Sequence, residues 1–267
     1  MGNRERRHNN KIVYGEDSVT KTYDSNIGFE RELLAYKVLN ENNFPLTKII
    51  YIYPKNRAIS FEKINHEYGL EKLSRERVKN ASRVLYNLHN MPINEKVSED
   101  ISDPRFPIQR FSHSLTNHVI NKYVGSLKNH FDMGNLESTL NKLGSKLKPE
   151  KFSYTWFDAK MRHFFFNQDD TVKATIDFEY FGIFDPLVDV GNLLADVSEL
   201  GGVNPRPFIN AILENYLLNK SSLEILPFYM ITSKLTQALC IDLPNGDIES
   251  ATKAVELSKI FTSQDLF

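Results

Sequence analysis

The chain has 267 residues, 41% of them hydrophobic and 25% charged, which is enough to bury a core and excludes wholesale disorder. The 33 lysine and arginine residues nearly balance the 34 aspartate and glutamate residues. The resulting formal net charge of −1 argues against a dedicated nucleic-acid-binding protein. A single cysteine, Cys240, excludes an intrachain disulfide and a zinc site built from several cysteines.

The N-terminal segment 1–10 is polar and charged, and no apolar run follows it as in a secretory signal. Nowhere does the sequence contain the roughly 18 to 20 uninterrupted apolar residues that a membrane span needs. We therefore expect a soluble, cytoplasmic protein with no nucleic-acid or membrane partner.

The N-terminal part of the chain is expected to form a small β-rich unit that contains one helix. β-Forming residues within 11–23 flank a Gly-Glu-Asp turn and predict two short strands. Apolar residues at helical spacing predict a helix over 28–42, with Asn26 as a candidate N-cap. Segments 47–53 and 57–64 then predict a hairpin.

Helical patterns dominate the rest of the chain. An amphipathic helix is predicted over 73–91, and residues 104–147 are polar with weaker helical patterns. Strand-like runs occur over 152–158 and 163–178. Further helices are predicted over 187–199, 205–219, 223–239 and 248–262. Because strands and helices are largely segregated along the chain, an α+β fold is favoured over an alternating α/β fold.

The most informative stretch, residues 154–189, places two aspartates at the ends of strand-like runs. Asp158 ends the first run, and Asp177 directly follows the strand-like residues Thr175 and Ile176. A hairpin between the two runs would let both carboxylates converge on one cleft. One carboxylate could then orient or deprotonate a hydroxyl group while the other held Mg²⁺.

The segment Ile176-Asp177-Phe178-Glu179, followed by Asp185-Pro186-Leu187-Val188-Asp189, carries a more specific pattern. It resembles the I-D-F/W-E and D-P-x-x-D motifs of the aminoglycoside phosphotransferase and choline kinase superfamily. The resemblance implies an α+β, bilobal, protein-kinase-like fold. The implied lobes are a small, β-rich N-terminal lobe over 1–65 and a larger, mostly helical C-terminal lobe over 66–267.

The resemblance also implies roles for residues of the N-terminal lobe. Lys21 stands where the family has the lysine that contacts the nucleotide phosphates. Glu32, in the predicted helix, stands where a glutamate fixes that lysine. Glu62 and Ile64 lie in the strand that would enter the hinge, whose backbone would meet an adenine.

In the C-terminal lobe, the resemblance implies that Asp158 accepts the proton of an acceptor hydroxyl and that Asp177 binds Mg²⁺. Lys160, two positions after Asp158, would neutralise charge on the transferring phosphoryl group. The expected function is transfer of the γ-phosphate of ATP to a hydroxyl of a small-molecule acceptor, with ATP and Mg²⁺ as cofactors. The sequence identifies neither the acceptor nor the oligomeric state.

Departures from the family pattern keep a second interpretation open. Trp156-Phe157 replaces the His-Gly before the catalytic aspartate, and His163 replaces the metal-binding asparagine. Neutral imidazole binds metals although Mg²⁺ prefers oxygen, so His163 is either a second metal ligand or an ordinary half-buried histidine. Only Gly2 and Gly15 are available near the first strands for a phosphate-binding loop. The alternative is a pseudokinase, a kinase-like binding or regulatory protein with impaired catalysis.

Two further side chains are expected to have structural roles. Trp156 is expected to pack in the core. Asp189 is expected to accept backbone hydrogen bonds at the start of its own helix. A third possibility is an accidental match in an unrelated α+β protein, which the absence of a small sheet before residue 66 would reveal.

Overall fold

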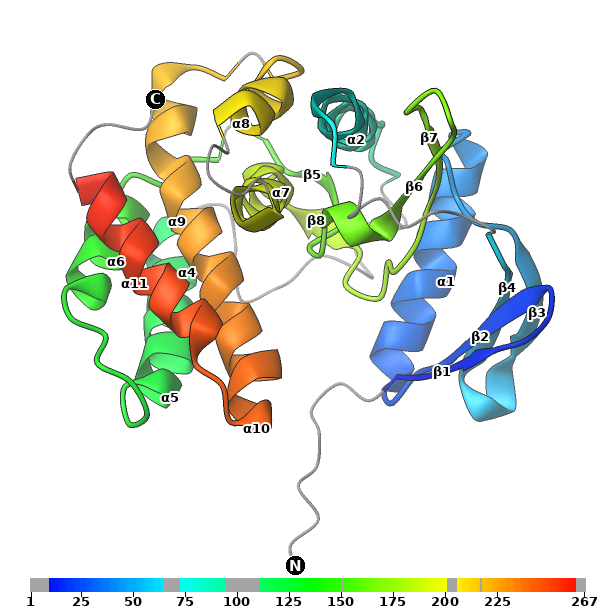
Figure 1. The fold of residues 1–267 in the computed structure, drawn as a ribbon, viewed down its shortest axis with the longest axis horizontal. Coiled ribbons are helices and arrows are strands. Elements are labelled where there is room, and N and C mark those ends of the chain that lie inside the picture. The colour runs from blue at the N-terminus through cyan, green and yellow to red at the C-terminus, as the bar shows by residue number, and fades with distance from the viewer. Residues whose placement is uncertain are drawn as a thin grey trace, which may run out of the picture.

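The chain folds into a sheet-containing lobe and a helical lobe that lie side by side (Figure 1). This is the α+β, bilobal arrangement that the sequence predicts, and the small sheet before residue 66 is present. In the computed structural model, the described residues are 10–64, 73–94, 111–149, 151–200, 206–216 and 218–262. The predicted boundary between the lobes, at residues 65 and 66, lies outside these described residues.

The N-terminal lobe is built on an antiparallel sheet of four strands in the order β1-β2-β4-β3. The strands are β1 (Lys11–Tyr14), β2 (Ser18–Thr22), β3 (Ile49–Tyr53) and β4 (Ala58–Glu62). The register pairs Lys21 of β2 with Ile59 of β4, so Lys21 lies on an inner strand. Both predicted strand pairs are confirmed, and a 3-10 turn over Pro54–Asn56 connects β3 to β4.

Helix α1 (Asn26–Glu41) follows β2 and packs beside the sheet. Its N-cap is Ser25, whose hydroxyl accepts a backbone hydrogen bond from the first turn at 3.0 Å. Asn26, the predicted cap, is instead the first helical residue. Tyr36 on the buried face of α1 meets the ring of Phe178 from the C-terminal lobe at a centroid distance of 6.2 Å. Helix α1 therefore contacts the motif region of the other lobe, residues 154–189.

The C-terminal lobe consists mostly of helices, as predicted. Helix α2 (Arg75–His89) packs against α7 (Leu187–Leu200) and α8 (Arg206–Leu213), and α7 packs against α9 (Lys220–Gln237). The other α-helices among the described residues are α4 (Phe111–Val119), α5 (Gly125–Leu127), α6 (Leu136–Gly144), α10 (Leu243–Asn245) and α11 (Glu249–Thr262). π-Helical turns over Ile120–Val124 and Ala238–Asp242 continue α4 and α9. No helix in the described part of the chain is both long and apolar enough to cross a membrane.

Two short antiparallel ladders interrupt these helices and carry the loops of the motif region. Strand β5 (Ser153–Thr155) pairs with β8 (Gly182–Phe184), and β6 (Phe164–Phe166) pairs with β7 (Val172–Thr175). The strand-like runs predicted here are confirmed as shorter strands, whereas β8 was not predicted. Asp158 follows β5 in the chain, as expected.

Backbone pairing joins the two lobes close to the motif region. The N–H of Thr47 donates to the oxygen of Thr175 at 3.3 Å, and the Thr175 hydroxyl donates to the oxygen of Pro45 at 2.5 Å. Leu46 forms a parallel bridge with Thr175. Because Asp177 follows Thr175 by two residues, the N-terminal lobe helps to fix the loop that carries Asp177.

Gly191 of α7 permits the close approach of α7 to α9. A Cβ added at Gly191 would lie 2.4 Å from the Cβ of Tyr229, which is too short for any real contact. We therefore expect Gly191→Ala to lower the free energy of unfolding by about 1–3 kcal/mol, the usual cost of overpacking, in a denaturant titration.

The matched control for this substitution is Gly125→Ala. A Cβ at Gly125 would meet the oxygen of Ile120 at an ordinary distance of 3.5 Å. Since glycine in a helix is about 0.5–1 kcal/mol less favourable than alanine, the control is expected to be neutral or slightly stabilising. Equal losses for the two variants would contradict the close-packing explanation.

Candidate active site

Lys21 lies among three carboxylates at the junction of the lobes. Its ammonium nitrogen lies 2.9 Å from Glu32, 2.6 Å from Asp177 and 3.1 Å from Glu179. Lys21 is 8% exposed and Glu32 only 1%, so this ion pair is buried. The structure thus brings together three residues that the sequence predicts for one site. It adds Glu179, to which the sequence analysis gave no role.

The charges of Lys21 and the carboxylates around it shift one another's pKa values. Burial lowers the pKa of Lys21, but attraction to the three carboxylates outweighs burial and raises that pKa above its usual value. Burial raises the pKa of Asp177, but neighbouring basic side chains, Lys21 among them, outweigh it and hold that pKa below its usual range. At Glu179 the effect of burial prevails, and the pKa is raised. Three carboxylates around one ammonium group leave an excess of negative charge that suits a cation.

Glu32 also connects α1 to the loop that follows Asp177. Its Oε1 accepts a hydrogen bond from the backbone N–H of Phe178 at 3.2 Å. Its Oε2 accepts one from the hydroxyl of Tyr23 at 2.6 Å. Glu32 therefore fixes both the lysine, as expected, and the backbone next to the Asp177 carboxylate, which was not expected.

Asp158 lies in the loop between β5 and a 3-10 turn over Met161–His163. Its Oδ1 lies 2.7 Å from the ammonium of Lys160, and the two side chains are 22% and 12% exposed. The structure thus places the predicted proton acceptor beside the lysine predicted to neutralise the phosphoryl group. Both side chains keep some contact with solvent, as side chains that meet a ligand must.

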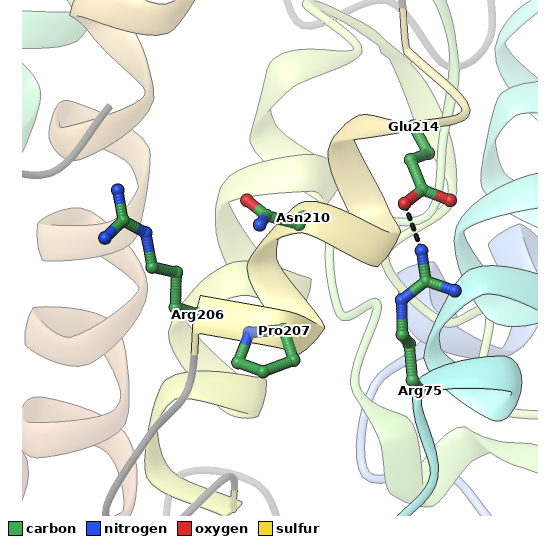
Figure 2. A pocket seen from close by; sticks show the side chains of 5 residues that line it. All are labelled: Arg75, Arg206, Pro207, Asn210 and Glu214. Atoms are coloured by element: carbon green, nitrogen blue, oxygen red, sulfur yellow. Dashed lines mark hydrogen bonds and ion pairs between the residues drawn. The ribbon is translucent and has the colours of Figure 1, made fainter.

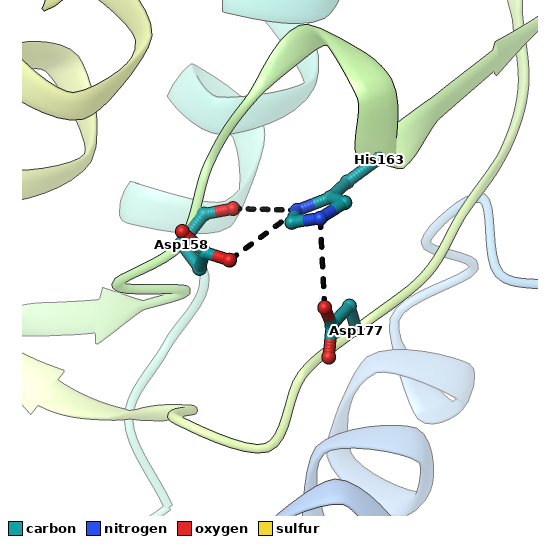
Figure 3. Close-up of side chains that lie close together, drawn as sticks. All are labelled: Asp158, His163 and Asp177. Carbon is teal, nitrogen blue, oxygen red and sulfur yellow. Dashed lines mark hydrogen bonds and ion pairs between the residues drawn. The ribbon is translucent and has the colours of Figure 1, made fainter. Parts of the chain in front are cut away.

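His163 lies between the two aspartates, as Figure 3 shows. Its Nδ1 lies 2.8 Å from the backbone oxygen of Asp158, and its Nε2 lies 3.5 Å from Oδ2 of Asp177. One ligand atom from each of the three residues falls within 4.8 Å of the others, so they could hold a single metal ion. The histidine is buried and hydrogen-bonded, and it also faces the site.

Trp156 fixes the backbone of Asp177. The indole N–H donates to the Asp177 backbone oxygen at 2.6 Å, and the ring stacks on Phe178 at a centroid distance of 4.4 Å. Trp156 is fully buried, which confirms its predicted packing role. Asp177 has a left-handed φ of 73°, a conformation that aspartate tolerates better than most residues. Trp156 is therefore a positioning residue as well, which the sequence analysis missed.

Asp189 holds the loop that leads to Asp158. Its two carboxylate oxygens accept the backbone N–H groups of Trp156 and Phe157, each at 2.7 Å. His89, at the end of α2, lies 3.0 Å from the same carboxylate. The prediction that Asp189 accepts backbone N–H groups of its own helix was therefore wrong, because these bonds run to a distant loop.

Two more side chains of α7 hold the same loop. Asn192 donates to the oxygen of Phe157 at 2.6 Å, and Asp196 accepts the N–H of Met161 at 2.8 Å. With Asp189, these residues form a polar stripe at i, i+3 and i+7 along one face of α7. That spacing is readable in the sequence and could have identified Asn192 and Asp196, which the sequence analysis missed.

Glu62 and Ile64 lie at the end of β4 and just beyond it. The side chain of Glu62 is exposed, and its backbone N–H donates to the oxygen of Lys48 at 2.8 Å. Among the described residues, no contact is seen between either residue and Lys21 or the three carboxylates around it. Their place in a nucleotide-binding hinge stays a prediction.

A separate pocket lies between the start of α2 and the length of α8 (Figure 2). Arg75 and Glu214 form an ion pair across it. Its lining residues are Arg75, Arg206, Pro207, Asn210 and Glu214. None of these is a predicted site residue. The pocket adjoins the start of α2, whereas His89 at the other end of α2 contacts Asp189, which holds the loop that leads to Asp158. The chemistry is therefore sought at Asp158 and Asp177 and not in this pocket.

The family profile described as the phosphotransferase enzyme family matches residues 27–224, well over half of the chain. The chain belongs to this phosphotransferase family. The matched region contains Glu32, Asp158 and Asp177, and it begins after Lys21. No curated protein matches the sequence.

Solved structures confirm the fold. A choline/ethanolamine kinase family protein from Mesorhizobium loti is 15% identical, covers 96% of this chain and 86% of its own, and has a TM-score of 0.66. The GDP and kanamycin complex of the aminoglycoside phosphotransferase APH(2")-IIIa is 16% identical, with coverages of 100% and 93% and a TM-score of 0.67. An AMP-bound spectinomycin phosphotransferase is 15% identical, with coverages of 94% and 89% and a TM-score of 0.64.

Proposed function

We propose that the protein transfers the γ-phosphate of ATP to a hydroxyl group of a small molecule. The observation that carries this proposal is the convergence of the buried Lys21–Glu32 pair with the Asp177 carboxylate, beside the Asp158 loop. Membership of the phosphotransferase family supports the type of reaction.

Each side chain has a role that follows from its charge and place. Lys21, kept in position and charged by Glu32, binds the nucleotide phosphates. Asp158, whose Oδ1 lies 2.7 Å from the ammonium of Lys160, orients the acceptor hydroxyl and accepts its proton. Lys160 offsets negative charge on the group being transferred. The protein contributes mostly positioning and charge compensation.

The residues around Asp177 fit a divalent cation. The carboxylates outnumber the ammonium group here, and Asp177 and His163 direct an oxygen and a nitrogen into the same space. Asp177 and His163 would hold the ion, which, when bound, compensates the charge of the nucleotide phosphates. Glu179, whose pKa burial raises, has a carboxylate oxygen within 4.8 Å of oxygens of Asp177 and Glu32 and is a third carboxylate in reach of the same cation.

The acceptor class follows from the relatives. The structures of APH(2")-IIIa and APH(2")-IIa contain the aminoglycosides kanamycin and gentamicin, and the related choline/ethanolamine kinase family is named for amino alcohols. We therefore propose a small hydroxylated acceptor of this general kind. The test panel comprises kanamycin, gentamicin, spectinomycin, choline and ethanolamine.

The first test is the thermal midpoint of the protein with and without Mg-ATP, beside the Asp177→Asn variant. A ligand at 100 times its Kd stabilises the folded state by about 2.7 kcal/mol, which corresponds to a rise on the order of 5 °C for a chain of this size. We expect this rise in the parent protein and its loss in the variant, which removes the carboxylate charge. Asparagine is preferred to alanine because it tolerates the left-handed φ at this position.

The exposed Asp132→Asn variant is the matched control and is expected to keep the full rise. Absence of any rise in the parent protein with ATP and either Mg²⁺ or Mn²⁺ would count against the proposal. A rise without ADP formation in the presence of any acceptor of the panel would favour the pseudokinase, an alternative that His163 and Phe157 keep open as departures from the family motif.

A further inference from the structure

The ring of His163 is fixed in one tautomer. Nδ1 donates its hydrogen to the backbone oxygen of Asp158 at 2.8 Å, and Nε2 accepts a hydrogen bond from Arg162 at 3.2 Å. An imidazole that donates from Nδ1 and accepts at Nε2 is neutral and carries a lone pair on Nε2. A backbone oxygen on the far nitrogen is the arrangement that orients histidines for metal ligation. His163 is 5% exposed, so the protein holds this orientation.

The lone pair of His163 faces an acidic oxygen. Nε2 lies 3.5 Å from Oδ2 of Asp177, and the two atoms could therefore bind one ion from neighbouring positions. Mg²⁺ binds oxygen ligands and dehydrates reluctantly. Mn²⁺ accepts carboxylate oxygen, and affinity for imidazole nitrogen rises from Mn²⁺ through the later first-row divalent metals. The donor pair at this site is thus poorly matched to Mg²⁺.

We propose that His163 makes the nucleotide–metal site of this protein select a first-row divalent transition metal, with Mn²⁺ as the probe, over Mg²⁺. This inference rests on the proposed function, because the ion arrives with the nucleotide phosphates. Two contacts must change for it to bind. Arg162 is exposed, so its guanidinium leaves Nε2 without losing hydration, and Lys21 turns from Asp177 to the phosphates.

The first experiment measures the affinity of the protein for β,γ-methylene-ATP by calorimetry, once with saturating Mn²⁺ and once with saturating Mg²⁺. The variants are His163→Asn and His163→Gln, which offer an amide oxygen, and the exposed His113→Asn is the matched control. The ratio of the two affinities should fall at least about tenfold in both His163 variants and stay unchanged in the control, the loss typical of altered metal sites. The comparison between variants cancels the metal preference of the nucleotide itself.

The second experiment uses pulsed EPR of Mn²⁺ in the same complex, with the protein labelled with ¹⁵N only at histidine. A directly bound His163 gives a ¹⁵N coupling in the parent protein and in His113→Asn, and no such coupling in the His163 variants. This measurement needs no activity and reads the ligand itself. Should a His163 variant fail to fold, the coupling in the parent protein still decides whether a histidine binds the ion.

The outcomes separate this inference from the proposed function. Binding of both metal–nucleotide complexes without a ¹⁵N coupling, or with an unchanged affinity ratio in the His163 variants, overturns the metal preference and leaves the proposed function standing. If the nucleotide binds neither with Mn²⁺ nor with Mg²⁺, the metal preference and the proposed function are both overturned. A coupling together with a lowered ratio supports the inference.

Discussion

Replacement of Asp158 by asparagine is expected to lower the rate of phosphoryl transfer by about 10²–10⁴-fold, the contribution typical of general acid–base catalysis. Asparagine keeps the shape of the side chain but cannot accept the proton of the acceptor hydroxyl. The contact between His163 and Asp158 uses the backbone oxygen of Asp158 and survives the substitution. Nucleotide binding should therefore remain while turnover is lost.

The measurement is ADP formation with the acceptor of the panel that the parent protein phosphorylates fastest. The thermal rise with Mn-ATP and with Mg-ATP is recorded in parallel, so that a loss of folding is not mistaken for a loss of chemistry. The exposed Asp132→Asn variant should retain the parent rate. A rate for Asp158→Asn within about threefold of the parent rate, far from the 10²-fold loss expected of a missing general base, would exclude Asp158 as the proton acceptor.

The part of the site that the sequence predicts is the part that local patterns encode. Periodicity predicts only the strand that carries Lys21 and the helix that carries Glu32. The pairing of these two side chains was implied by the family resemblance. Asp177 was predicted because it directly follows a strand-like run and lies in the Ile-Asp-Phe-Glu motif. The four-stranded sheet and the surrounding helices were likewise predictable from strand and helix periodicity.

The part that the sequence analysis did not predict depends on contacts between distant segments. Asp189 was assigned to its own helix because aspartates commonly cap helices, yet the helix turns its carboxylate to a loop more than thirty residues earlier in the chain. Strand β8 has only three residues and becomes a strand through pairing with β5. Neither outcome follows from local propensity, since tertiary contacts decide both.

The departures from the family motif have physical counterparts in the structure. Where the family has histidine, Trp156 supplies an indole N–H to the Asp177 backbone. Where the family has glycine, Phe157 adopts a left-handed φ of 66°, which costs a residue with a Cβ roughly 1–2 kcal/mol. Asp189 and Asn192 hold that residue from both sides by bonding its N–H and its oxygen. The loop thus keeps an ordered geometry without the family's residues, which favours retained catalysis over a decayed site.

Substitution of Asp189 by alanine is expected to lower the free energy of unfolding by about 2–6 kcal/mol, the cost of leaving two buried N–H groups without an acceptor. Asp189 is fully buried, and alanine would leave the N–H groups of Trp156 and Phe157 without an acceptor, at about 1–3 kcal/mol for each unpaired group. His89 would lose the same partner and keep only the hydroxyl of Tyr216 at 3.0 Å.

We expect Asp189→Ala to lower the thermal midpoint on the order of 10 °C. The matched control is Glu256→Ala, an exposed position on α11, which should change the free energy of unfolding by less than about 0.5 kcal/mol. Asp189→Asn keeps one acceptor oxygen but turns an amide N–H toward a backbone N–H. Its stability should therefore lie between those of Asp189→Ala and Glu256→Ala. At a temperature where Asp189→Asn remains folded, its transfer rate should still fall, because Phe157 loses a contact that maintains its left-handed φ. If Asp189→Asn instead kept the parent rate together with a lowered midpoint, Asp189 would stabilise the lobe without positioning Asp158.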